Sequence, residues 1–151
     1  MKKSSGLTLI EILVSATIIM VIAGLSLAAY ADFNNRQILN STADELKNNL
    51  RQVRGWAMAG RKLSGCTGDL VGYQVSFSPP FSFQYQVEAV CPNAVPVNTF
   101  SYSDKVVINS GQSPFLFQAL TGETGADSFA ITLSLGSRSK VLNINSNGEI
   151  N

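Results

Sequence analysis

The chain has 151 residues, with 11 lysines and arginines against 10 aspartates and glutamates, no histidine and two cysteines. This length allows one domain of ordinary size with an appendage. The lack of histidine excludes Ser-His-Asp and Cys-His catalysis, histidine-ligated zinc or haem, and a histidine pH switch. A formal charge of +1 supplies no overall field that attracts nucleic acid, and charged residues make up only 14% of the chain.

The charge is missing from the N-terminal part of the chain. Residues 12–31 read ILVSATIIMVIAGLSLAAYA and carry no charge. At about 1.5 Å per residue, a helix of this length spans the roughly 30 Å hydrocarbon core of a bilayer. Lys2 and Lys3 precede the run, so the positive-inside rule predicts a cytoplasmic N-terminus with the rest of the chain across the membrane. A cleaved secretory signal is a less favoured alternative, because the apolar region of such a signal is shorter than the run in this chain.

One carboxylate, that of Glu11, stands at the mouth of this apolar run. A charged side chain costs about 2.5–3.5 kcal/mol at the bilayer centre and less near the edge, so it normally marks a partner or a function. The alternative is that Glu11 reaches the cytoplasmic headgroups and interacts with the positive end of the helix dipole. Hydropathy alone does not choose between these interpretations.

The residues around Glu11 form a specific motif. Residues 6–11, GLTLIE, follow a short lysine-containing leader and resemble the class III signal of type IV prepilins and type II secretion pseudopilins. The resemblance implies that a prepilin peptidase cuts between Gly6 and Leu7 and then methylates the new amine of Leu7. Leu7 departs from the phenylalanine that is most usual in the family.

Cleavage at this bond gives Glu11 an assembly role. It creates a cationic amine on Leu7, one helical turn or about 6 Å along the axis from Glu11. Opposite charges on neighbouring subunits then neutralise each other and set axial register more than they add net stability. The resemblance therefore assigns Glu11 to subunit recruitment and register. It implies four kinds of partner: the prepilin peptidase, other pilin or pseudopilin subunits, an inner-membrane assembly platform, and membrane lipid before assembly.

A helical period continues beyond the apolar run. Apolar residues recur at steps of three and four with charged residues between them, which predicts an amphipathic helix with one buried stripe. The stripe consists of Leu39, Ala43, Leu46, Leu50, Val53 and Ala57. Residues 7 to about 60 are expected to form a single helix roughly 80 Å long. Gly24, Ser26 and Asn34-Asn35 are candidate points of loosening, and an independent coiled coil is the alternative.

The sequence from Gly60 onward has a β pattern. Apolar residues alternate in 71–77 and 81–89 around Pro79-Pro80, which predicts an antiparallel pair. Further strands are expected at 105–109, 115–119, 128–135 and 140–145, between turn signals. The fold class is therefore α+β, a long N-terminal helix packed on a small antiparallel head that is a sandwich or a curled sheet. The expected domains are a cleaved leader (1–6), a transmembrane and filament-core helix (7–31), an amphipathic helix (32–60) and a β head (61–151).

A second resemblance concerns the subclass. The helical segment 44–62 and the closing segment 140–150 are similar to the H-type minor pseudopilins of type II secretion and their type IV pilus counterparts, the FimT class, with Leu50, Arg54 and Ala57 in comparable places.

Some members of that class take up DNA, and the candidate contacts here are Arg138 and Lys140, which follow Gly136 in a predicted hairpin loop. Ordinary solvated turn charges are the favoured interpretation, so nucleic acid is an unlikely partner.

Cys66 and Cys91 are predicted to lie outside the cytoplasm and to form a disulfide. The bond would close a loop of about 26 residues and contribute on the order of 3–4 kcal/mol. Two free buried thiols are the alternative, and no metal or other cofactor is expected. The head carboxylates are scattered without a paired arrangement, so no catalytic residue and no enzymatic activity are expected.

These features predict a structural subunit of a filament, favoured as a minor subunit of a type II secretion pseudopilus or a type IV pilus. The expected location is the inner membrane, with one span and the head in the periplasm or outside the cell, and then the filament. Three alternatives stay open: a major pilin, a tip adhesin or DNA-uptake receptor, and a membrane-anchored β domain that does not polymerise.

Overall fold

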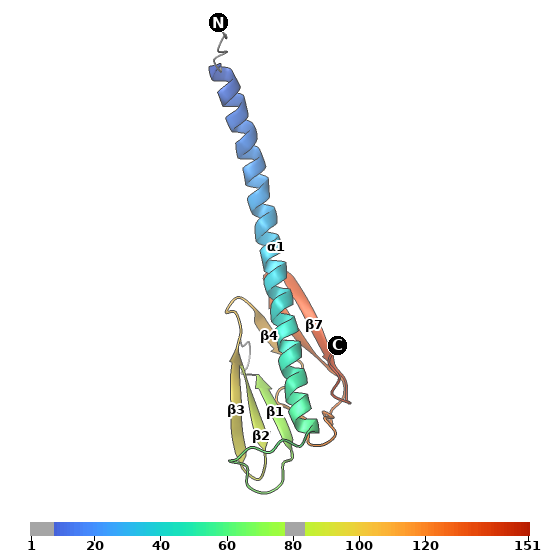
Figure 1. Ribbon diagram of the computed structural model, residues 1–151. Helices are drawn as coiled ribbons and strands as arrows, with labels where there is room; N and C mark the ends of the chain where they lie inside the picture. The colour runs from blue at the N-terminus through green and yellow to red at the C-terminus, as the bar shows by residue number, and fades with distance from the viewer. Residues whose placement is uncertain (1–7, 78–83) are drawn as a thin grey trace. The chain divides into compact units, whose positions relative to one another are not determined.

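A computed structural model describes residues 8–77 and 84–151, leaving out the side chains of residues 25–29. One long helix, α1 (Leu9–Met58), precedes an antiparallel β head (Figure 1), which confirms the α+β fold class. The strands are β1 (Gly72–Phe77), β2 (Gln84–Val90), β3 (Ala94–Ser101), β4 (Val107–Ser110), β5 (Phe115–Gln118), β6 (Phe129–Leu135) and β7 (Arg138–Ile144). The predicted break at Pro79-Pro80 and the start of the second predicted strand at 81–83 lie outside the described residues.

The chain divides into two compact units within α1, one up to Gln37 and one over Ile38–Asn151. In the first unit, the described residues from Leu9 onward are helical, and most of the large apolar side chains are exposed. Gly24, Ser26 and Asn34-Asn35 are all α-helical, so the structure shows no loosening at these points. Among the described residues, no helix combines the length and the apolar character that crossing a bilayer requires.

The second unit begins with the amphipathic part of α1. All six residues of the predicted stripe are at most 5% exposed, which confirms the period from Leu39 to Ala57. The helix then ends in a Schellman motif, because Gly60 adopts a positive φ of 58°. The Gly60 N–H donates to the Ala57 carbonyl at 2.9 Å, and the Arg61 N–H donates to the Trp56 carbonyl at 3.0 Å. Glycine suits this position because left-handed backbone costs it little.

The strands form two antiparallel sheets, one of four strands in the order β3-β2-β1-β5 and one of three in the order β4-β6-β7. β1 and β2 pair in register from Gly72↔Val90 to Phe77↔Tyr85, which confirms the predicted pair. The eight boundaries of β4, β5, β6 and β7 also lie within two residues of the predicted ones. β3 was not expected, because Pro96 interrupts its pattern; the strand tolerates this proline because it lies at a sheet edge.

A single core joins α1 to both sheets. The buried stripe of α1 belongs to the same cluster as Tyr73 and Val75 of β1, Ile108 of β4 and Leu133 of β6. Figure 1 shows the C-terminal part of α1 lying in front of both sheets. The helix therefore supplies one face of the head core, and the two sheets supply the other.

We expect Leu50→Ala to lower the free energy of unfolding of the head by about 2–5 kcal/mol, because it leaves a cavity where a fully buried side chain packs. Gln52→Ala, at an exposed position of the same helix, is the matched control and should change it by less than about 0.5 kcal/mol. Urea unfolding followed by circular dichroism measures both. Equal stability of the two variants would contradict this packing.

An aromatic cluster in the head joins residues of β1, β2 and β3 with Tyr102. The ring of Tyr85 lies 5.3 Å from that of Phe77, 4.9 Å from that of Phe100 and 5.7 Å from that of Tyr102. Asn49 of α1 donates to the Tyr102 hydroxyl at 3.5 Å. Burial raises the pKa of Tyr102 to about 12, and it raises the pKa of Tyr85 as well.

These tyrosines should make the head sensitive to alkali. An unfolded tyrosine ionises near pH 10, whereas the folded protein keeps the Tyr102 proton until about pH 12, so the free energy of unfolding falls as pH rises between these values. Tyr102→Phe should make that fall shallower, as measured by urea unfolding across this range. Tyr30→Phe, at an exposed position in the first unit, should leave it unchanged. The same slope in both variants would be evidence against burial of Tyr102 as the cause of the alkaline loss of stability.

Candidate functional site

The described part of the N-terminal motif forms the cap of α1. The Glu11 N–H donates to the Thr8 carbonyl at 3.1 Å and lies 3.3 Å from the Thr8 Oγ1. Threonine followed three residues later by glutamate is the spacing of a capping box. Glu11 therefore occupies the first turn, where the helix dipole favours a negative charge. The expectations from sequence did not include this cap, although the Thr8-x-x-Glu11 spacing signals it.

The part of α1 around and beyond Glu11 exposes apolar side chains on all sides. Its exposed large apolar residues cover every face of nearly four turns: Leu9, Ile10, Ile12, Leu13, Val14, Ile18, Ile19, Met20, Val21 and Ile22. An apolar surface of this extent is rare on a soluble monomer and marks contact with lipid or with protein. Gly6 and Leu7, the predicted cleavage site, lie outside the described residues.

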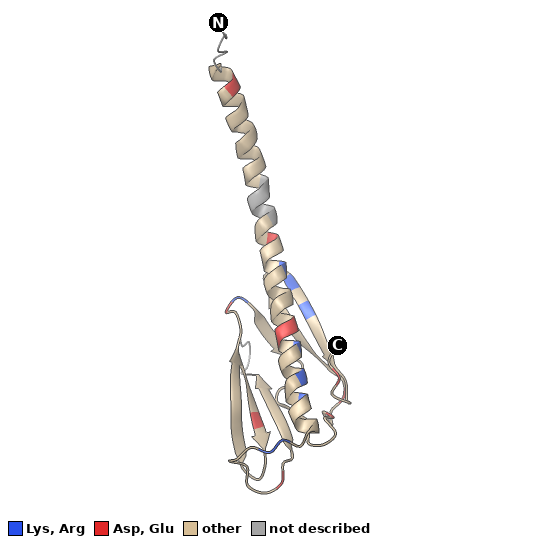
Figure 2. Ribbon diagram, in the orientation of Figure 1, with Lys and Arg blue, Asp and Glu red and all other residues tan. Residues whose placement is uncertain are grey.

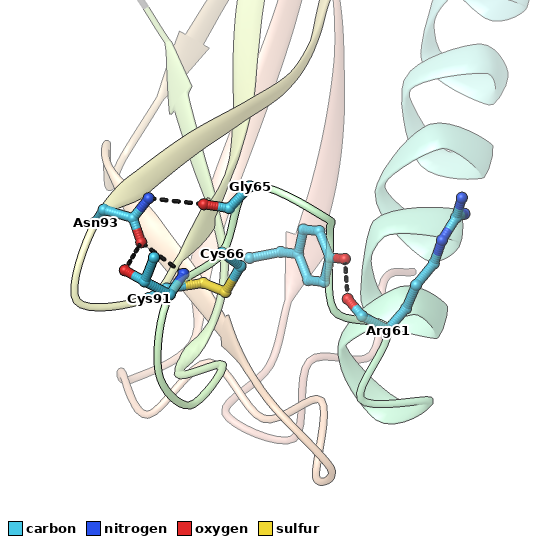
Figure 3. The surroundings of a disulfide bond; sticks show 7 residues. Arg61, Gly65, Cys66, Cys91 and Asn93 are labelled. Carbon is cyan, nitrogen blue, oxygen red and sulfur yellow. Dashed lines mark hydrogen bonds between the residues drawn. A yellow bond between two sulfur atoms is a disulfide. The ribbon is translucent and has the colours of Figure 1, made fainter.

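The cysteines are joined by a Cys66–Cys91 disulfide with a Cα–Cα distance of 5.8 Å, which confirms the predicted bond (Figure 3). Asn93 reinforces the link. Its Oδ1 accepts from the Thr67 N–H at 2.9 Å and from the Thr67 hydroxyl at 2.7 Å, and its Nδ2 donates to the Gly65 carbonyl at 2.9 Å. The loop between α1 and β1 is therefore fastened to the turn between β2 and β3 by one covalent bond and three hydrogen bonds.

Arg54 of α1 holds two distant loops. Its Nη2 donates to the Asn147 carbonyl at 2.9 Å and its Nε donates to the Gly122 carbonyl at 3.3 Å. The two loops cross closely there, since a Cβ on Gly148 would lie 2.1 Å from the Gly122 oxygen. Arg54, which occupies a position of the resemblance to the H-type class, thus has a structural role in this head. The sequence signal for this role is that Arg54 directly follows Val53 of the apolar stripe, and the structure shows Arg54 half-buried there.

The prediction that Arg138 and Lys140 lie in a hairpin loop is wrong, whereas the strand predicted from residue 140 is confirmed. Both belong to β7, and the loop consists of Gly136 and Ser137. Figure 2 shows basic residues along this strand. The Lys140 ammonium donates to Asn40 Oδ1 at 3.2 Å and lies 3.5 Å from Asp44 Oδ1, so its charge is directed to α1. The strand pairing that places these residues could not be read from local turn signals.

A further feature of the molecule is the distribution of side chains that could bind a metal ion. Over residues 8–77 and 84–151, no group of three or more cysteine, aspartate or glutamate side chains is placed to hold a metal ion. The polar contacts of the head instead connect its elements to one another.

Comparison with known families identifies the N-terminal segment. Residues 1–27 match the family model described as the prokaryotic N-terminal methylation motif. The chain therefore carries the class III signal of type IV pilins and pseudopilins, as the resemblance of residues 6–11 indicates. The motif implies processing by a prepilin peptidase and assembly with other pilin subunits. Searches of curated proteins and of solved structures gave no match.

We expect Arg54→Met to lower the free energy of unfolding of the head by about 1–3 kcal/mol, because two carbonyls lose a charged donor. Arg36→Met is the matched control. It removes an exposed ion pair with Asp32 at 3.2 Å and should cost less than about 0.5 kcal/mol. Urea unfolding measures both. A cost for Arg54→Met no larger than that of the control would show that the two contacts do not stabilise the head.

Proposed function

We propose that this chain is a non-enzymatic structural subunit of a pilus or pseudopilus, cut after Gly6, methylated on Leu7 and then polymerised. The observation that carries this proposal is the methylation motif over residues 1–27, within which α1 begins and exposes apolar side chains on every face. A peptidase signal and an apolar polymerisation surface are both required of such a subunit. The favoured machine is a type II secretion pseudopilus or a type IV pilus, with this chain as a minor subunit.

Before assembly, the N-terminal part of the chain resides in the inner membrane with its first residues in the cytoplasm. The uncharged run at 12–31 and the preceding Lys2 and Lys3 support this placement. The Cys66–Cys91 bond supports a head outside the cytoplasm, where disulfides form and persist. The exposed apolar helix exchanges lipid for the helices of other subunits on assembly, so the same side chains serve both states.

Glu11 recruits and registers the incoming subunit. Its place in the first turn leaves the carboxylate exposed beside the end of the helix that processing would make cationic. In an apolar filament core, a carboxylate without a partner is heavily penalised, which favours the one axial position where a neighbour's Leu7 amine meets it. Arg138 and Lys140 are not assigned to DNA, because the Lys140 charge is directed to α1.

Intact-mass spectrometry of the protein from its native membrane tests the processing step. We expect loss of residues 1–6 and the gain of one methyl group on Leu7. A chain that begins at Met1 in cells with an active prepilin peptidase would refute the proposal. In the same cells, Glu11→Gln should leave cleavage intact and lower incorporation into filaments at least about tenfold, because the charge that sets register is lost.

Glu45→Gln, at an exposed position on the same helix, is the matched control and should assemble as the unmodified chain does. Sheared filament fractions, quantified against the membrane fraction, give the incorporation of each variant. Equal incorporation of Glu11→Gln and Glu45→Gln would show that Glu11 does not set register. It would not affect the conclusion on cleavage and methylation.

A further inference from the structure

Leu120 has a left-handed backbone conformation, which leucine rarely adopts. Its φ is 71°, and it is the one non-glycine residue with a positive φ within residues 8–77 and 84–151. The backbone at this point is used, because the Leu120 N–H donates to the Ala57 carbonyl at the end of α1 at 2.9 Å. Glycine or asparagine would serve that bond with less strain. The leucine side chain is nevertheless present and 76% exposed.

Leu120 lies in a small apolar surface with Met58 and Val71, which we call the Leu120 patch. Met58 is 48% exposed and Val71 is 51% exposed. The three segments are adjacent, since Ala119 donates to the Val71 carbonyl at 2.9 Å and Leu120 donates to that of Ala57. A Cβ on Gly60 would lie 3.1 Å from Leu120 Cδ2, and one on Gly122 would lie 2.6 Å from Met58 Cγ. The two glycines thus leave room for the side chains of the patch.

The size of the patch indicates what kind of partner it takes. Three partly exposed side chains offer far less than the roughly 800 Å² per partner that a stable protein interface buries. The patch therefore cannot hold a soluble dimer by itself, and its partner has to be kept close by other contacts. A neighbouring subunit of a polymer meets this condition. The inference therefore rests on the proposed function, which makes the chain a filament subunit.

The complementary surface lies on α1 of the first unit. Among the described residues, α1 between Leu9 and Phe33 carries the exposed large apolar side chains that lie outside the patch. The one exception is Val141. Within that stretch, Tyr30 and Phe33 are 70% and 64% exposed and, three residues apart, share a helix face. Asp32 lies between them and is exposed although it pairs with Arg36.

The charges beside the patch favour this segment over the rest of the helix. Arg61 and Lys62 follow directly after Gly60 and are exposed, and the Arg61 guanidinium already lies 5.4 Å from the centre of the Trp56 ring. Cations of this kind prefer aromatic faces and carboxylates as partners. The segment 30–33 offers both, whereas residues 12–22 carry neither a charge nor an aromatic ring. We propose that the Leu120 patch of one copy binds the Tyr30–Phe33 segment of a second copy in the assembled polymer.

Cysteine crosslinking in the full-length chain tests this contact. With Leu120→Cys and Phe33→Cys on the same chain, a short bismaleimide that alkylates one thiol on each copy should produce a ladder of multimers from purified filaments. The native cysteines are joined to each other and do not react. Val141→Cys with Phe33→Cys is the matched control, since Val141 is also exposed but lies outside the patch. A ladder from the control as strong as that from the test pair would overturn the proposal.

Leu120→Asn separates a binding role from a structural one. Asparagine tolerates positive φ, so the melting temperature of the head should not fall, while incorporation into filaments should fall roughly fivefold or more. Val141→Thr should leave incorporation unchanged. A lower melting temperature for Leu120→Asn would show that the leucine serves the fold, and unchanged incorporation would show that it does not serve assembly; either result overturns the inference.

Two further outcomes identify other arrangements. Crosslinks between two copies that each carry only Leu120→Cys would replace the proposed contact with a head-to-head one. Filaments of processed subunits that give no Leu120–Phe33 crosslink would refute this inference while leaving the proposed function standing. A chain that is neither processed nor polymerised would refute both.

Discussion

Burial of one stripe of α1 against two sheets is the interaction on which the head depends. Six residues from Leu39 to Ala57 form this stripe, and both sheets meet it in one core. Neither sheet closes on itself, and a sheet of three or four strands needs an apolar partner to become stable. The helix provides that partner, so its C-terminal part is an integral piece of the head rather than a linker to it.

The same helix has two kinds of surface along its length. Up to Phe33 its large apolar side chains are mostly exposed. From Leu39 to Ala57 one apolar stripe is buried, and Met58 at the end of the helix is exposed again. Its two ends are also built differently. Thr8 caps the first turn through its side chain, whereas Gly60 closes the last turn through a positive φ. A single element can therefore offer an unsatisfied apolar surface and anchor a folded head.

Around the C-terminal end of α1, polar contacts determine how the loops of the head are arranged. Asn93 and the disulfide fasten the loop after α1, and Arg54 binds two later loops through their carbonyls. Leu120 donates its N–H to the helix end while exposing its side chain. Because these contacts fix the backbone of the loops, the Leu120 patch is presented in a defined conformation, as a specific contact requires.

Several features followed from local sequence alone. The stripe of α1, the β1–β2 pair and the end of the helix near Gly60 are set by period and by glycine, which act over a few residues. The methylation motif likewise depends on the order of adjacent residues and is confirmed over residues 1–27. The disulfide needed only two cysteines and an expected location outside the cytoplasm.

Tertiary structure decided the rest. β3 was not predicted because it contains Pro96, which has no backbone N–H to donate. Whether a strand tolerates a proline depends on its place in the sheet, and β3 lies at an edge. The contacts of Lys140 with Asn40 and Asp44, about a hundred positions earlier, were not expected, although a strand was predicted from residue 140. The bonds of Arg54 and the exposure of Leu120 also depend on segments far apart in the chain. Local patterns carry no information on such pairings, because they are fixed only when the helix and both sheets bury a common core.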